Sequence, residues 1–181
     1  MGSKKTDVKK EIKENYIIIF SISGKEYSSK LEEIVGASAK AFSKICYVSL
    51  NKPYDTLVPI FKKLGIETGK MIFVDCVTAG FSKHVDGLNV VSVSSPKALT
   101  EMNIAINKTS DREKFQGLVF DSLSTLLVHE QPSTVIKFSH SVISKLRTAE
   151  SHGVFMCLRE DMKGELMKDL SMFVDKIVEL G

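Results

Sequence analysis

The chain of 181 residues lacks several features that mark particular classes of protein. It contains no tryptophan and only four prolines, and none of its apolar runs is long enough to cross a membrane as a helix. The first fifteen residues are rich in charge and show no signal-peptide pattern. Together these absences predict a soluble, cytoplasmic protein without a transmembrane segment.

Metal and nucleic-acid signals are also weak. The three cysteines, Cys46, Cys76 and Cys157, form no C-x-x-C pair, and each lies in or beside an apolar run. We therefore expect buried, reduced thiols and no cysteine-bound metal. The net charge of +3 is small, and the basic residues are dispersed among acidic ones, so the sequence predicts no nucleic-acid partner.

What the sequence does contain is a regular alternation of apolar strands and amphipathic helices. This alternation predicts an α/β fold with a mostly parallel central sheet and helices on both faces. Residues 1–15 are expected to form a charged, solvated tail, and residues 16–181 a single domain. The expected strands are 16–20, 45–49, 71–75, 89–93, 117–121 and 154–158, and the expected helices are 29–42, 53–64, 95–107, one that begins at 132, and 165–180.

The strand at residues 117–121 organises the rest of the prediction. Its apolar run Leu118–Phe120 is typical of a strand buried on both faces, and it ends on Asp121. This carboxylate could hold Mg²⁺, as in a Walker B element, or could cap the next helix; the residues alone leave both interpretations open. Because residues 16–20 are equally apolar, we expect the two strands to be neighbours at the centre of the sheet.

Five segments, taken in order, resemble the core of RecA/KaiC-type ATPases, and the resemblance covers about residues 16–180. It implies a three-layer RecA-like fold, a Walker A loop after the first strand, glutamates that activate water after the second, and a Walker B aspartate at Asp121. It also implies a subunit of a ring or filament with nucleotide between neighbours. The segments are 46–50, 64–66, 72–75, 119–123 and 173–180.

Two catalytic features of that family are missing. A Walker A loop reads G-x-x-x-x-G-K-[ST], but around Gly24-Lys25 the first glycine position is Ile19 and the hydroxyl position is Glu26. After the second strand, Asn51 and Lys52 occupy the glutamate positions, and neither can serve as a general base at neutral pH. We therefore expect no ATP hydrolysis and no catalytic residue.

The sequence thus predicts a RecA/KaiC-like domain without an intact Walker A loop. Such a domain would be a non-hydrolysing binding, regulatory or assembly module that needs no cofactor and has a protein partner or associates with itself. Two alternatives stay open: an ATP-binding ATPase with an atypical phosphate loop that uses ATP and Mg²⁺, and an unrelated doubly wound small-molecule enzyme. The residues Arg159, Glu160 and Asp161 are expected to share the rim with Asp121. The nucleotide-binding candidates are Ser23, Gly24, Lys25, Ser28, Asp121 and Ser122, with Asp121 as a Mg²⁺ ligand only when nucleotide is bound.

Overall fold

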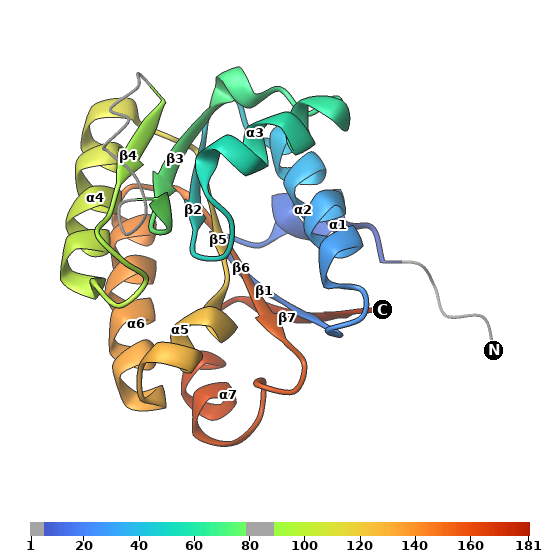
Figure 1. The fold of residues 1–181 in the computed structure, drawn as a ribbon. Helices are drawn as coiled ribbons and strands as arrows, with labels where there is room; N and C mark the ends of the chain where they lie inside the picture. Colours follow the sequence, from blue (N-terminus) through green and yellow to red (C-terminus); the bar gives the residue numbers. More distant parts are fainter. Residues whose placement is uncertain (1–5, 79–88) are drawn as a thin grey trace.

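The computed structural model describes residues 6–78 and 89–181. Its described part is built around one seven-stranded sheet with the strand order β4-β3-β2-β5-β6-β1-β7 (Figure 1). All the strand pairs in this sheet are parallel, so the carboxyl ends of the strands meet at one edge. The strands are β1 (Ile17–Ile22), β2 (Ile45–Ser49), β3 (Met71–Asp75), β4 (Val90–Ser92), β5 (Gly117–Asp121), β6 (His152–Leu158) and β7 (Lys176–Leu180).

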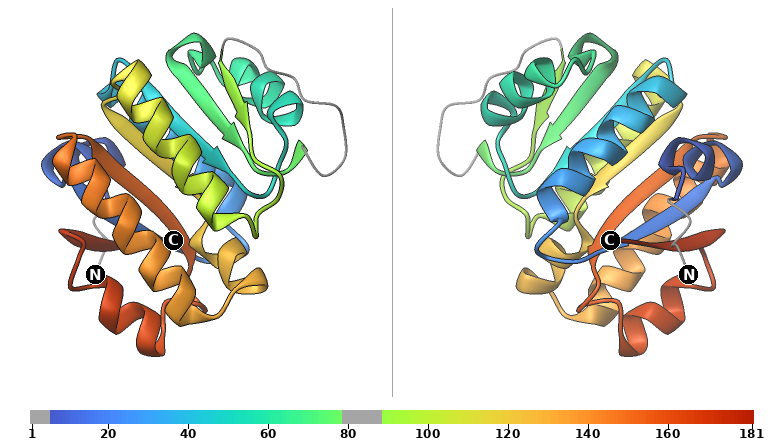
Figure 2. Two further views of the ribbon diagram at one scale, coloured as in Figure 1. Left: turned by 90° about the vertical axis from the view of Figure 1, so that its left-hand side faces the viewer. Right: turned by 90° about the vertical axis from the view of Figure 1, so that its right-hand side faces the viewer.

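Helices cover both faces of the sheet, which gives three layers (Figure 2). One face carries α1 (Val8–Glu14), α2 (Tyr27–Ala41) and α3 (Tyr54–Lys63). The other face carries α4 (Leu99–Glu113), α5 (Leu123–His129), α6 (Pro132–Thr148) and α7 (Gly164–Leu170), and a short 3-10 helix, η1 (Thr68–Lys70), precedes β3. The α/β class and the parallel sheet with helices on both faces are as predicted, and the arrangement is consistent with a three-layer RecA-like fold.

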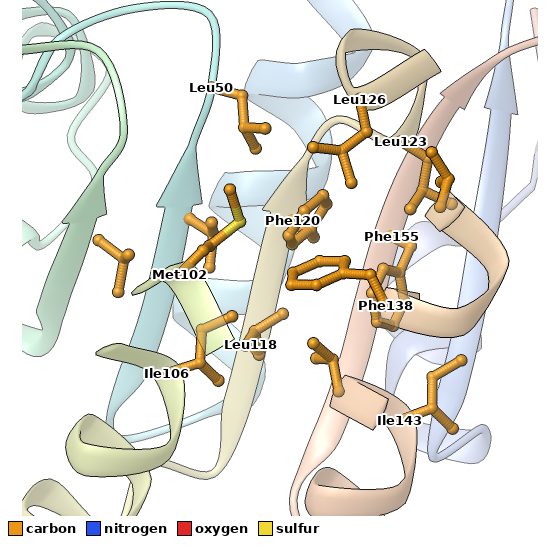
Figure 3. Close-up of a cluster of buried hydrophobic side chains, with 14 of the residues drawn as sticks. Leu50, Met102, Ile106, Leu118, Phe120, Leu123, Leu126, Phe138, Ile143 and Phe155 are labelled. Carbon is orange, nitrogen blue, oxygen red and sulfur yellow. The ribbon is translucent and has the colours of Figure 1, made fainter. Parts of the chain in front are cut away.

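The centre of the sheet is buried on both sides because β5 sends apolar side chains to both helical layers. Leu118 and Phe120 join the cluster under α4, α5 and α6, whereas Val119 joins the cluster under α2 and α3. Phe120 packs against both Phe138 and Phe155, with ring centroids 5.9 and 5.7 Å away (Figure 3). This packing holds the end of β5, and with it Asp121, in a fixed position.

Several elements lie where the sequence predicts them. The strands β2 and β5 span the residues expected, and α3 follows Pro53. Gly65 ends that helix with φ +71°, the left-handed conformation that a residue without Cβ adopts at no steric cost. Local sequence patterns predict these elements correctly because the apolar run and the residues that end it indicate the same boundaries.

The predicted pairing of the strands 117–121 and 16–20 is wrong. β5 lies between β2 and β6, and β6 separates it from β1. Both strands are interior, as their apolar runs require. A run of apolar residues shows that a strand is buried on both faces, but it does not specify the neighbouring strand.

The C-terminal segment also departs from the prediction of one helix over 165–180. The helix α7 ends at Leu170, and β7 then pairs in parallel with β1, so β6 is not the last strand. Asp175 fixes the start of β7, because its carboxylate accepts hydrogen bonds from the backbone N–H of Ile17 at 2.7 Å and from Arg147 at 2.8 Å.

Differences at the helix starts are smaller. α2 begins at Tyr27, not at residue 29, and its N-cap residue makes no side-chain cap. α4 begins at Leu99, later than predicted. The helix α5 was not predicted, because its seven residues follow the central strand directly.

The N-terminal segment is not a solvated tail over its described residues. Residues 8–14 form α1, which Asp7 caps by accepting a hydrogen bond from the backbone N–H of Lys10. Val8 and Ile12, four residues apart, are buried against α2 and the sheet. In the part of the chain that the structure describes, no helix is both long and apolar enough to span a membrane.

Candidate functional site

The candidate site lies at the carboxyl ends of β1, β2, β5 and β6. Asp121 ends β5 with only 1% of its surface exposed, and the peptide bond that follows it is cis. A buried carboxylate is costly unless hydrogen-bond donors satisfy it. The side chains around Asp121 therefore decide what the site can do.

Three uncharged donors, from α2, from β2 and from the loop after β2, meet this carboxylate. The hydroxyl of Tyr27, at the start of α2, donates to Oδ1, and the hydroxyl of Tyr47, in β2, donates to Oδ2 at 2.8 Å. The amide of Asn51 also donates to Oδ1, at 2.9 Å. Asp121 therefore ties the beginning of α2 and the end of β2 to the central strand.

The hydrogen bonds around Asp121 bear on its two possible roles, as a Mg²⁺ ligand and as a helix cap. Asp121 does not cap α5, because Ser122 is the N-cap residue and accepts from the backbone N–H of Thr125. The donor set does not suit Mg²⁺ either, because the two hydroxyls and the amide direct hydrogen atoms at the carboxylate oxygens that a cation would need. Within residues 6–78 and 89–181, no three acidic, histidine or cysteine side chains are grouped to hold a metal ion.

Asn51 connects the predicted site to its surroundings. Its side-chain oxygen accepts from the hydroxyl of Thr125 at 2.6 Å while its amide donates to Asp121. The residue at a position where the resembled family carries a glutamate thus faces the strand-end carboxylate here. It acts as a hydrogen-bond bridge between β5, α5 and the loop after β2.

The connection from β1 to α2 is too short for a Walker A loop. Only residues 23–26 lie between the end of β1 and the first residue of α2. The hydroxyl of Ser23 donates to the Glu26 carboxylate at 2.8 Å, and the backbone N–H of Glu26 donates to the Ser23 carbonyl at 3.0 Å, which closes a tight turn. A phosphate cradle needs a longer loop with its N–H groups directed inward.

A cavity of about 340 Å³ opens beside Asp121. Of the predicted nucleotide-binding residues, Ser28, Asp121 and Ser122 line it, whereas Ser23, Gly24 and Lys25 do not. Asp161, expected at the same rim, also lines the cavity; Arg159 instead binds the backbone carbonyls of Leu180 and Gly181. The lining is completed by Tyr27, Leu31, Asn51, Lys52, Ser124, Thr125, Val128 and Leu158.

A larger cavity, of about 730 Å³, lies elsewhere, between α1, α2 and the turn after α3. Its lining includes both acidic residues and lysines, but no carboxylate from the end of a strand. The smaller cavity is the better candidate because parallel sheets bind ligands at the carboxyl ends of their strands.

Sequence reasoning missed Tyr27 and Tyr47. Tyr47 lies within the predicted strand 45–49, and Tyr27 lies before the predicted helix 29–42, with no role assigned to either side chain. The available signal was that a buried tyrosine hydroxyl needs a partner and that a buried aspartate needs donors.

A second strand-end acid, Asp75, is also buried but serves the backbone. Its carboxylate accepts from the N–H groups of Tyr54 at 2.8 Å, Val77 at 2.8 Å and Thr78 at 3.0 Å, and from the Thr78 hydroxyl. These bonds fasten the end of β3 to the start of α3. Asp75 does not line the cavity beside Asp121, and its hydrogen bonds give it a structural role.

The two tyrosines predict a loss of stability at alkaline pH. Burial, followed by the charge of Asp121, raises the pKa of both Tyr27 and Tyr47 well above the ordinary value. The unfolded chain releases these protons near pH 10 while the folded protein retains them, so their stabilising contribution is complete below about pH 10. Above it, the free energy of unfolding should fall by about 1.4 kcal/mol per pH unit for each tyrosine.

Denaturant unfolding at a series of alkaline pH values measures this slope. A Tyr47→Phe variant should lose stability less steeply with pH than the wild type, because it lacks the retained hydroxyl proton. Equal slopes in wild type and Tyr47→Phe would contradict the assignment of a retained proton to Tyr47.

Comparison with known proteins places the chain in a family without assigning it an activity. No curated protein matches the sequence. The model of a family of unknown function, DUF7504, matches residues 64–180, which includes Asp75, Asp121 and β7. The matched segment is well over half of the chain, and the protein therefore belongs to the family of unknown function DUF7504.

Proposed function

We propose that this protein is a RecA/KaiC-like domain that has lost ATPase chemistry and acts in the cytoplasm as a binding, regulatory or assembly module. The observation that carries the proposal is the state of Asp121, whose carboxylate is held by Tyr27, Tyr47 and Asn51. In an ATPase of the resembled family, this carboxylate would serve Mg²⁺. Here three protein donors occupy its oxygens.

Two further features support the loss of hydrolysis. The four-residue turn after β1 leaves no room for a loop that wraps a phosphate group. At the position expected to activate water, Asn51 cannot accept a proton at neutral pH. Positioning of phosphate, binding of metal and activation of water are therefore all compromised in the same crevice.

A binding or assembly role agrees with the surface near the site. Val128 lines the cavity and is 77% exposed. An exposed apolar side chain at the site is suited to contact with a protein partner or a second copy of the chain.

We expect steady-state ATP hydrolysis by the wild-type protein to equal that of buffer, with and without Mg²⁺. The test is a phosphate-release assay on wild type and an Asp121→Asn variant, which keeps the size of the side chain. Turnover by the wild type that disappears in Asp121→Asn would contradict the proposal and favour an ATPase with an atypical phosphate loop.

A further inference from the structure

Two charged side chains on the cavity beside Asp121 have no partner in the described structure. Lys52 enters from the loop after β2, and Asp161 from the turn after β6. Neither side chain makes an ion pair or a hydrogen bond with any residue of 6–78 or 89–181. Both line the cavity and are partly buried, and each can form a charge-assisted hydrogen bond with a ligand group of opposite charge.

The remainder of the cavity sets the size and polarity of that ligand. Leu31, Val128 and Leu158 give it an apolar wall. Its volume of about 340 Å³ is near the lower limit of ligand pockets, which are roughly 300–1,000 Å³. The fitting ligand is small and partly apolar.

The position in the sheet is one where α/β proteins bind ligands. The chain leaves β1 and β2 toward the helical layer of α2 and α3, but leaves β5 and β6 toward the layer of α5, α6 and α7 (Figure 2). The connections therefore diverge between β2 and β5, and again between β6 and β1. Such switch points open a crevice at the carboxyl ends of the strands.

Local charge distinguishes the two sides of this crevice. The fifteen-residue helix α2 begins at the cavity, and its first turn receives no side-chain cap. Its dipole adds to the positive charge of Lys52 and favours an anionic group on that side. Asp161 favours a cationic group, and a polyphosphate would be repelled by Asp161 and Asp121 together.

We propose that the cavity binds a small zwitterion with an aliphatic body, such as a free amino acid, with Lys52 on its carboxylate and Asp161 on its ammonium group. Ser28 is exposed and lines the same cavity, and its hydroxyl can donate a hydrogen bond to the carboxylate. This inference rests on the proposed function, because it requires a crevice that nucleotide does not occupy. It names the ligand class of the binding module.

Calorimetric titration of the full chain with L-leucine tests this inference. Two probes of the same aliphatic shape serve as comparisons: isocaproate, which lacks the ammonium group, and isoamylamine, which lacks the carboxylate. We expect L-leucine to bind and each single-charge probe to bind roughly tenfold to hundredfold more weakly, because each loses one charge-assisted hydrogen bond.

Two variants assign the charges to residues. Lys52→Met should weaken the binding of L-leucine by a similar factor and leave the affinity for isoamylamine unchanged. Asp161→Asn should also weaken the binding of L-leucine, but leave the affinity for isocaproate unchanged. Lys63→Met and Asp169→Asn are the matched controls, because neither residue lines the cavity, and both should bind as the wild type does. If one variant fails to fold by circular dichroism, the other variant with its probe still decides the assignment.

Absence of saturable L-leucine binding, single-charge probes that bind as tightly as L-leucine, or unchanged binding in both variants would each overturn the zwitterion site. None of these outcomes involves ATP, so the proposed loss of ATPase chemistry would stand. ATP turnover in the phosphate-release assay would instead contradict the proposed function itself.

Discussion

Replacing Asp121 by alanine is expected to lower the free energy of unfolding by about 3 kcal/mol. The substitution leaves the hydroxyls of Tyr27 and Tyr47 without their acceptor, and Tyr47 is fully buried. It also frees the Asn51 amide, so the start of α2 and the loop after β2 both lose their attachment to β5. For a chain of this length, the change corresponds to a Tm lower by roughly 6–12 °C.

Thermal and urea unfolding of wild type and Asp121→Ala measure this difference. Asp169→Ala is a suitable control, because the Asp169 side chain makes no hydrogen bond or ion pair with the part of the chain that the structure describes. A Tyr47→Phe and Asp121→Asn double-mutant cycle then isolates the contact itself. If the free energy of unfolding decreased no more in Asp121→Ala than in the control, the hydrogen bonds from the three donors to this carboxylate would not stabilise the fold.

The second large effect is expected at Asp75. Its replacement by alanine removes the acceptor of three backbone N–H groups and one hydroxyl, all at the junction of β3 and α3. We expect a decrease of about 3 kcal/mol in the free energy of unfolding, because four partly buried donors lose their acceptor together and each keeps a desolvation penalty.

The measurement is urea unfolding, with Asp75→Asn as the companion variant. Asparagine keeps one carbonyl oxygen and should recover part of the loss, whereas Thr78→Val removes only the hydroxyl donor and should cost about 1 kcal/mol. If Asp75→Ala were as stable as Thr78→Val, the backbone N–H groups would not depend on Asp75, contrary to the structure.

The sequence was sufficient for the elements whose local signals agree. In β5 the apolar run, its short length and the terminal Asp121 all indicate a strand buried on both faces, and the structure has that strand over the residues predicted. Pro53 and Gly65 bracket α3 through the restricted φ of proline and the left-handed φ of glycine. These signals are local and need no knowledge of distant contacts.

The C-terminal segment shows where such signals fail. Phe173, Val174 and Ile177 have helical spacing, yet only residues up to Leu170 form a helix. The following strand exists because it pairs with β1 and because Asp175 binds the backbone N–H of Ile17, about 160 residues earlier in the chain. Tertiary pairing of this kind overrides local propensity.

The site was predictable in position but not in chemistry. A strand-end acid in a parallel sheet places Asp121 at the crevice, and the missing Walker A residues suggest an altered role. The partners Tyr27 and Tyr47 lie 94 and 74 residues away in sequence, so only the fold brings them to Asp121. For the same reason, the meeting of Lys52 and Asp161 at one cavity could not be inferred from sequence spacing.

The most direct test of the account is whether Mg-ATP stabilises the protein. A ligand that binds only the folded state adds about 2.7 kcal/mol to the free energy of unfolding when its concentration is a hundred times the dissociation constant. The Tm rises as a result. Because protein donors hold the Asp121 carboxylate and the turn after β1 is short, we predict that millimolar Mg-ATP leaves the Tm of both wild type and Asp121→Ala unchanged. A wild-type Tm that rises with Mg-ATP, but not with ATP alone, while that of Asp121→Ala does not, would show that Asp121 still holds a nucleotide-bound metal.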